Sequence, residues 1–431
     1  MRVLGRFRKG TYGTVAGNVL ARLGALVSVS LATFVIARQG GAAAVGVYAL
    51  LRMLPSLVGV TISAGLPGAT AYFLAGSERT NRRLPWTIVG IALAGGSAGA
   101  LLWAGASVFL QHYLFQDLTG QLVLLASFAV LTRVLVATAK SCSQGTGDLP
   151  GSNRVIVLEE FMILPVYGGL WLAGGRGLGM LVATLLLADV LTVSLAWGRL
   201  VFRGFFREAA RPSLELARRI AAYGMRAQVG GFVLLLNLRL DFVLISVIAG
   251  PAVLGVYAIA SKYAERVKLV SLALTYVLYP TFAAETAVKA LQRARTMLPK
   301  AGAATAAVVV PLWVAAPFVI PAIYGSDFEP AVTPAHIILF GLVFDGIAGV
   351  ITALLYGLGR PGLNSIAMGL GLVVTVVLDV TLIPSFEATG AAIASACAYG
   401  ATTVSLVWFY WRIRRADRVA SFERPGLSGA S

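Results

Sequence analysis

Five basic side chains interrupt otherwise apolar stretches of this 431-residue chain: Arg22, Arg52, Arg133, Arg239 and Lys262. Each lies about six to twelve residues inside its apolar run. An arginine fork binds two phosphate oxygens at once, whereas a lysine acts as a point charge. The residue types therefore predict a binding site for an anionic group such as a diphosphate.

Two interpretations of these basic residues remain open. Asn18 lies one helical turn before Arg22 and is expected either to join the same site or to bond to a neighbouring helix. Each basic residue can instead pair with an acid on another helix and only hold the bundle together. The available acids are Glu159, Glu160, Asp189, Asp241, Asp345 and Asp379.

The acids also suggest ion coupling. Asp241, Asp345 and Asp379 lie within apolar runs, where a carboxylate can take up a proton in one state and release it in another. Glu265 has the i,i+3 spacing to reach Lys262 or Lys268. A purely structural pairing of each acid is the alternative.

Other chemistry finds no support in the sequence. Two cysteines, Cys142 and Cys397, and two distant histidines, His112 and His336, match no metal or disulfide pattern. The basic residues form short clusters between apolar runs, without a basic aromatic face for nucleic acid. We expect no catalytic residue, metal, cofactor or nucleic-acid partner.

The composition is that of an integral membrane protein. Apolar residues make up 58% of the chain, charged residues make up 12%, and the mean hydropathy is +0.84. A soluble domain carries about twice that share of charge. Runs of alternating polarity, as in a membrane barrel, are absent from the sequence, so helices are the expected spanning elements.

Twelve apolar runs are long enough to span a bilayer as helices. They cover about 13–37, 44–66, 84–110, 121–141, 155–174, 178–200, 226–249, 252–278, 301–324, 334–357, 362–384 and 388–411. The first run is too long for the apolar region of a signal peptide and is expected to be a span. One set of connections carries 25 basic residues and the other carries only Arg38 and Arg176. This asymmetry predicts that both termini are cytoplasmic.

The chain also carries an internal repeat. Residues 45–49 recur at 254–258, an offset of 209, and residues 145–153 resemble 357–364 at an offset of about 211–212. An even number of spans per repeat predicts two parallel six-helix halves, the plan of transporters that rock around a central site. We expect a first half at 1–200, a cytoplasmic linker at 201–225, a second half at 226–411 and a basic cytoplasmic tail at 412–431.

The chain resembles a known family at several of these positions. The stretches are Asn237-Leu238-Arg239-Leu240-Asp241, Leu254–Ala260, Tyr279-Pro280, Gly46-Val47-Tyr48 and Gly145-Thr146-Gly147-Asp148. Over essentially its whole length it is similar to the polysaccharide-unit flippases (Wzx type) of the multidrug/oligosaccharidyl-lipid/polysaccharide exporter superfamily. The resemblance implies a transporter that flips polyprenyl-pyrophosphate-linked oligosaccharide from the cytoplasmic to the outer leaflet. It places the protein in a bacterial inner membrane.

Three other functions are weighed against this expectation. An ion-coupled multidrug exporter shares the fold but should favour acids and aromatics over arginines in its site. Relatives that flip the peptidoglycan lipid precursor usually have fourteen spans. A membrane polysaccharide polymerase or ligase should carry a large outer loop, whereas the predicted outer loops are short. Expected partners are the lipid-linked oligosaccharide, anionic membrane lipids near the linker, and a polymerase or glycosyltransferases.

Overall fold

The computed structural model describes residues 2–63 and 65–422. Its description of side chains leaves out 2–16, 19, 60, 77, 79, 227–238 and 416–422. Over the described ranges the chain forms helices joined by turns, with no β-strand. The helices fall into two compact units. Unit 1 runs to Leu235 and includes Gly250–Ala252, and unit 2 comprises Leu236–Ala249 and the chain from Val253.

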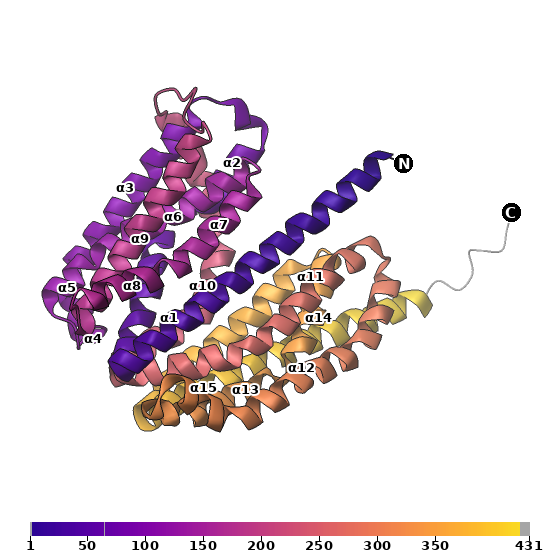
Figure 1. The fold of residues 1–431 in the computed structure, drawn as a ribbon. Coiled ribbons are helices and arrows are strands. Elements are labelled where there is room, and N and C mark those ends of the chain that lie inside the picture. Colours follow the sequence, from indigo (N-terminus) through magenta and orange to yellow (C-terminus); the bar gives the residue numbers. More distant parts are fainter. Residues whose placement is uncertain (1, 64, 423–431) are drawn as a thin grey trace. The chain divides into compact units, whose positions relative to one another are not determined.

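Unit 1 is a helix bundle in which α3, α6 and α9 run side by side (Figure 1). Its elements are α1 (Arg2–Ile62), α2 (Leu66–Ala75), η1 (Ser77–Thr80), α3 (Leu84–Gly105), α4 (Ser107–Tyr113), α5 (Gly120–Leu125), α6 (Ser127–Gly145), α7 (Leu149–Phe161), α8 (Ile163–Leu172) and α9 (Gly177–Phe202). Proline occupies the first turn of α2, α3 and α7. Backbone N–H groups in the first turn have no acceptor within the helix, so a proline there costs no hydrogen bond. Asp148 caps α7 by accepting a hydrogen bond from Gly151 N at 3.1 Å.

Helix α10 (Leu214–Ala264) is shared by the two units. Unit 2 continues with η2 (Glu265–Val267), α11 (Lys268–Ala284), α12 (Ala287–Tyr324), η3 (Ser326–Ala331), α13 (Val332–Gly341), η4 (Leu342–Phe344), α14 (Asp345–Gly357) and α15 (Pro361–Phe422). Its buried core includes Phe282, Leu291, Ile351 and Leu355. These side chains come from α11, α12 and α14, which pack against one another.

Nine helical segments of the described chain are long and apolar enough to cross a membrane. Three of the nine, Leu20–Gly59, Arg239–Ala284 and Pro361–Arg415, contain a residue with non-helical backbone angles: Gly41, Gly250 and Glu387. Each of these residues lies where the sequence predicts a turn between two consecutive spans. The chain is therefore a multi-pass, all-helical membrane protein. The total of twelve spans and the cytoplasmic termini stay predictions.

The backbone repeats its unusual positions at the offset found in the sequence. Gly41 and Gly250 have φ of 66° and 86°, and they lie 209 residues apart. Gly147 and Gly359, at 83° and 69°, are 212 apart. Positive φ favours glycine, so the recurrence is a shared requirement of the two turns. It supports the predicted repeat, whereas superposition of the two halves about a membrane-normal axis stays a prediction.

The basic turns of unit 1 meet at one end of that unit. Arg82 pairs with Glu208 at 3.1 Å, Arg219 pairs with Glu78 at 2.7 Å, and Arg199 pairs with Asp148 at 2.7 Å. The sequence places the turns near 77–83, 142–154 and 201–225 on one side of the membrane. Their contacts agree with that arrangement within the unit. The segment 201–225 packs within unit 1 through Leu216 and Ile220, which lie in the first turns of α10.

Candidate functional site

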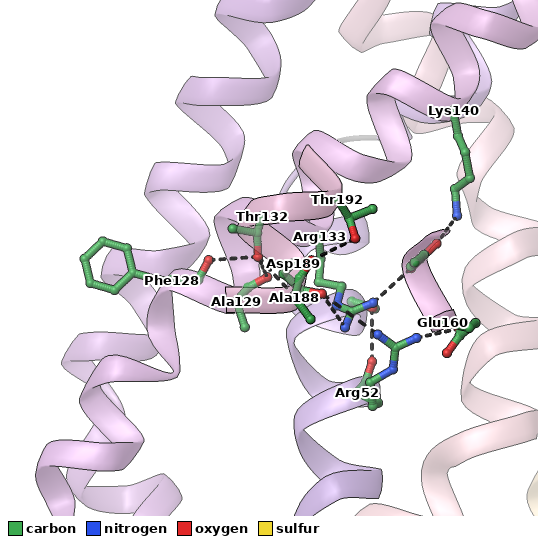
Figure 2. Close-up of polar contacts among 12 residues, drawn as sticks. Arg52, Phe128, Ala129, Thr132, Arg133, Lys140, Glu160, Ala188, Asp189 and Thr192 are labelled. Carbon is green, nitrogen blue, oxygen red and sulfur yellow. Dashed lines mark hydrogen bonds and ion pairs between the residues drawn. The ribbon is translucent and has the colours of Figure 1, made fainter. Parts of the chain in front are cut away.

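Arg133 is the centre of a buried ionic network in unit 1. Its Nη1 donates to Glu159 Oε1 at 2.9 Å, and its Nη2 lies 2.9 Å from Asp189 Oδ1 (Figure 2). Arg52 donates from Nη2 to Glu160, and its Nη1 lies 3.9 Å from Asp189 Oδ1. Lys140 Nζ donates to Glu159 Oε2 at 2.8 Å.

Four helices bring these groups together. Arg52 lies on α1, Arg133 and Lys140 lie on α6, the two glutamates lie on α7, and Asp189 lies on α9. Residues seven apart share a helix face, which explains why Arg133 and Lys140 reach the same carboxylate. Thr132 Oγ1 also lies 3.3 Å from Asp189 Oδ2 and hydrogen bonds to it. The network thus ties α1, α6, α7 and α9 to one another.

The network is balanced in formal charge, with three cations and three carboxylates. Among the described residues, three of its buried atoms nevertheless have no hydrogen-bond partner: Arg52 Nη1, Arg133 Nε and Glu160 Oε2. A buried polar atom without a partner is costly. The two arginines could therefore bind an incoming anion, which would accept hydrogen bonds from the guanidinium nitrogens that have no partner in the network.

Arg22 lies in a different environment on α1. Its side chain is exposed, and its Nε donates to Asn18 Oδ1 at 3.2 Å. Among the described side chains, no acid pairs with it. Asn18 therefore joins Arg22 as the sequence allowed, by an i,i+4 contact on one helix face.

In unit 2, the buried carboxylate of Asp241 accepts a hydrogen bond from one tyrosine hydroxyl. Tyr257 Oη donates to Asp241 Oδ2 at 2.6 Å and lies 2.8 Å from Ser395 Oγ. The backbone N of Phe242 also donates to Asp241, at 2.9 Å. Asp241 is only 8% exposed. Arg239 has its guanidinium 5.3 Å from the centre of the Phe242 ring, on the same helix.

Two further acids of unit 2 have few partners. Asp379 is fully buried, and neither of its carboxylate oxygens has a hydrogen-bond partner among the described residues. Asp345 Oδ2 is likewise buried and has no hydrogen-bond partner in the part of the chain that the structure describes. Neither acid forms an ion pair within the described part of the chain.

A small pocket borders Asp241. Its lining includes Asp241, Glu265, Ser395 and Tyr399. Lys268 lies 3.6 Å from Glu265 and donates to Tyr399 Oη at 3.1 Å. Lys268 thus forms an ion pair with Glu265 at the i,i+3 spacing seen in the sequence. The pocket presents carboxylate and hydroxyl oxygens, which suit a proton or a small hard cation.

The structure thus separates the predicted site residues into three groups. Arg52 and Arg133 share the ionic network of unit 1 and have the acid partners that the structural alternative anticipates. Arg22 and Asn18 form a second group on α1. In unit 2, Asp241 borders the pocket, and Lys262 is half-buried on α10.

Sequence reasoning missed Lys140, Tyr257, Ser395 and Tyr399. A hydroxyl within an apolar span carries no signal of its own, because serine and tyrosine are tolerated there in many roles. Lys140 lies near a predicted helix end, where its position in the sequence indicates only a basic residue of a loop. Its spacing of seven from Arg133 is the signal that could have found it.

Comparison with known proteins identifies the family of this chain. A family model described as "Polysaccharide biosynthesis protein" matches residues 35–333, more than half of the chain. The chain belongs to this family. A curated relative from Haloferax volcanii, the "Probable low-salt glycan biosynthesis flippase Agl15", is 24% identical over 381 residues, which cover 85% of this chain and 76% of the relative.

Solved structures show the same fold. A multidrug resistance MATE family transporter of the MOP superfamily has a TM-score of 0.71 at 14% identity, covering 92% of this chain and 96% of its own. The lipid II flippase MurJ has a TM-score of 0.67 at 14% identity, covering 92% and 89%. A MOP superfamily transporter from Pyrococcus furiosus has a TM-score of 0.59, also at 14% identity, covering 93% of each chain. The resemblance inferred from the sequence is confirmed by the family match and this fold.

Proposed function

We propose that this member of the family flips polyprenyl-pyrophosphate-linked oligosaccharide from the cytoplasmic to the outer leaflet by alternating access, for cell-surface polysaccharide synthesis. The family match and the glycan flippase relative support a lipid-linked glycan as the substrate. The expected location is a bacterial inner membrane. A polysaccharide polymerase or glycosyltransferases would act before or after this step.

The observation that carries the proposal is the state of Arg22. It lies within the apolar segment Leu20–Gly59, is exposed, and has Asn18 rather than an acid as its partner. A charge at such a position costs at least about 2.5–3.5 kcal/mol when it faces hydrocarbon. A water-filled cavity that admits an anionic diphosphate removes that cost. Arg22 is therefore the first candidate for phosphate binding, with Asn18 as a second hydrogen-bond donor.

Arg52 and Arg133 would act differently from Arg22. Both already have acid partners, yet Arg52 Nη1 and Arg133 Nε are open. We propose that the diphosphate displaces Glu160 from Arg52 while the headgroup passes. Arg239 and Lys262 would contribute from the second half as it moves.

Coupling is assigned to the acids of unit 2. Asp241, with its tyrosine and serine hydroxyls, and Asp379, without partners, would exchange a proton or cation during the cycle. Asp345 is the third candidate. These oxygens also favour the second function, ion-coupled export of cationic drugs. Export of a cationic drug in exchange for protons, at a rate that Arg22→Ala does not change, would support this second function instead.

A reconstituted assay tests the proposal. Vesicles would hold the purified protein and a polyprenyl diphosphate that carries a fluorescent sugar, and movement between leaflets would be followed with a membrane-impermeant quencher. We expect Arg22→Ala to slow the initial rate by at least about ten-fold, equivalent to about 1.4 kcal/mol, and Arg22→Lys to retain part of it. Arg38→Ala, an exposed change on the same helix, is the matched control. Wild-type flipping by Arg22→Ala would refute the proposed site.

A further inference from the structure

An open pocket lies at the end of unit 1 where the basic turns meet. It has a volume of about 450 Å3 and lies between the end of α2, η1 and the first turns of α10. Its lining includes Tyr72, Phe73, Tyr223, Glu78, Arg219 and Arg226. The volume falls within the range of about 300–1,000 Å3 that is typical of small-molecule sites. The pocket is separate from the ionic network of α1, α6, α7 and α9.

Helix periodicity brings the polar and aromatic groups of α10 to one face. Arg219, Tyr223 and Arg226 are spaced by four and three residues, so they lie one above another. On α2, Tyr72 and Phe73 precede the helix end at Ala75. The pocket is thus formed where the last turn of α2 faces a regular stripe of α10.

The aromatic rings are tightly ordered and still accessible. The rings of Tyr72 and Tyr223 are stacked with centroids 4.2 Å apart, and Phe73 meets Tyr223 edge-on at 5.9 Å. Tyr72 is 56% exposed and Tyr223 is 37% exposed. Interlocked rings lose little further conformational entropy when a ligand packs on them. They form a rigid apolar wall that is open to solvent.

The two arginines of the pocket differ in their partners. Arg219 donates to Glu78 at 2.7 Å and lies 6.0 Å from the centre of the Phe73 ring, so its charge is compensated. Arg226 is exposed, and within the described part of the chain no acid pairs with it. The pocket therefore combines aromatic faces with one uncompensated guanidinium.

We propose that this pocket binds an anionic sugar of the lipid-linked glycan before the glycan enters the transport path. The inference rests on the proposed function for the identity of the substrate. The apolar C–H face of a pyranose ring packs against the electron-rich face of an aromatic ring. Arg226 would hold the anionic group, either a sugar carboxylate or a sugar phosphate, through paired hydrogen bonds. The sequence expectation that this end of unit 1 is cytoplasmic agrees with loading from that side.

Soluble probes test binding directly. Saturation-transfer NMR on the full-length protein in nanodiscs would compare glucuronate, glucose 1-phosphate, glucose and inorganic phosphate. We expect the two anionic sugars to bind, and Arg226→Ala to weaken each by about five-fold, as expected for the loss of an exposed charge-assisted hydrogen bond. Arg218→Ala, an exposed arginine on the same helix outside the pocket lining, should leave binding unchanged. Preferential binding of glucuronate or of glucose 1-phosphate identifies the source of the negative charge.

Each other result overturns the proposal. Binding of glucose or of inorganic phosphate as strong as that of the tighter-binding anionic sugar would exclude a site for an anionic sugar. So would equal binding by wild type and Arg226→Ala. Tyr223→Phe keeps the ring stack and should preserve folding and most binding, whereas Tyr223→Leu should weaken both sugars. Arg22→Ala should keep probe binding while it loses flipping, so failure of the proposed transport function can be told apart from failure of this pocket.

Discussion

The two units solve the problem of buried charge in opposite ways. Unit 1 gathers three cations and three carboxylates into a network in which every charged side chain has a partner of opposite sign. Unit 2 holds Asp241 with the hydroxyl of Tyr257, which itself contacts Ser395, and leaves both oxygens of Asp379 without a donor among the described residues. Gly147 of unit 1 and Gly359 of unit 2, 212 residues apart, nevertheless both have positive φ. The two units therefore have this backbone feature in common and differ in their buried charges.

The difference suggests a division of roles. Arginines satisfied by acids can exchange one anion for another, which suits a headgroup that binds and leaves. Carboxylates that lack cations can exchange protons or small cations, which suits coupling. A protein in which apolar residues replace a buried ion pair is often just as stable. Stability alone therefore does not explain the buried charges, and a role in function does.

The largest expected effect is a difference in stability between the same substitution at the two buried aspartates, Asp189 and Asp379. Asp189→Asn removes the charge that Arg133 and Arg52 face, so we expect it to destabilise the protein by about 3–5 kcal/mol. Asp379→Asn, the same chemical change in unit 2, leaves no cation unpaired and should change the stability by less than about 1 kcal/mol. Unfolding in mixed micelles measures both variants. Equal losses would show that the two acids have equivalent environments.

A smaller effect tests the shared turns. Gly147→Ala and Gly359→Ala place a Cβ in open space but at φ of 83° and 69°, so each should cost about 1–2 kcal/mol through backbone strain alone. Gly90→Ala and Gly369→Ala are matched controls in helices, also with open space, and should stabilise by about 0.5–1 kcal/mol. A cost at only one of the two turns would argue against equivalent positions in the repeat.

The smallest expected effect concerns pH at the basic end of unit 1. Hydrogen bonds from Asn81 and then Arg219 lower the pKa of Glu78 below its ordinary 4.5. A lowered carboxylate pKa contributes stability that is present above the unfolded value and lost as pH falls through the folded value. The Tm difference between wild type and Glu78→Gln should therefore be constant at neutral pH, decline as pH falls below about 4.5, and vanish once pH is below the lowered pKa of Glu78. A difference that persists in strong acid would contradict this contact.

Much of this fold follows from sequence. Hydropathy predicts each apolar helical segment, and the recurrence of Val45–Ala49 anticipates the paired turns at Gly41 and Gly250. The ends of helices are harder to predict from sequence, because a span such as 252–278 is interrupted by η2 inside its apolar run. Composition alone carries no signal for such a local tightening.

The candidate site is only partly accessible from sequence. The arginines and acids stand out because charge is rare in apolar runs. Which acid each arginine meets depends on helix rotation, so the shared carboxylate of Arg133 and Lys140 required the structure. Hydroxyl partners such as Tyr257 are equally invisible, since their pairing across α10 and α15 is set by packing.

Export by cells that carry an Arg22→Ala, Arg52→Ala double variant tests the central claim most directly. Because Arg52 also pairs with Glu160, the comparison strain should carry Arg22→Ala, Arg52→Ala and Glu160→Gln, which removes the acid left without its partner. Protein abundance in the membrane and glycan on the cell surface would be measured in the same cells. The account predicts that abundance is normal in the triple variant and that export is abolished in both. Full glycan export by the double variant would contradict it.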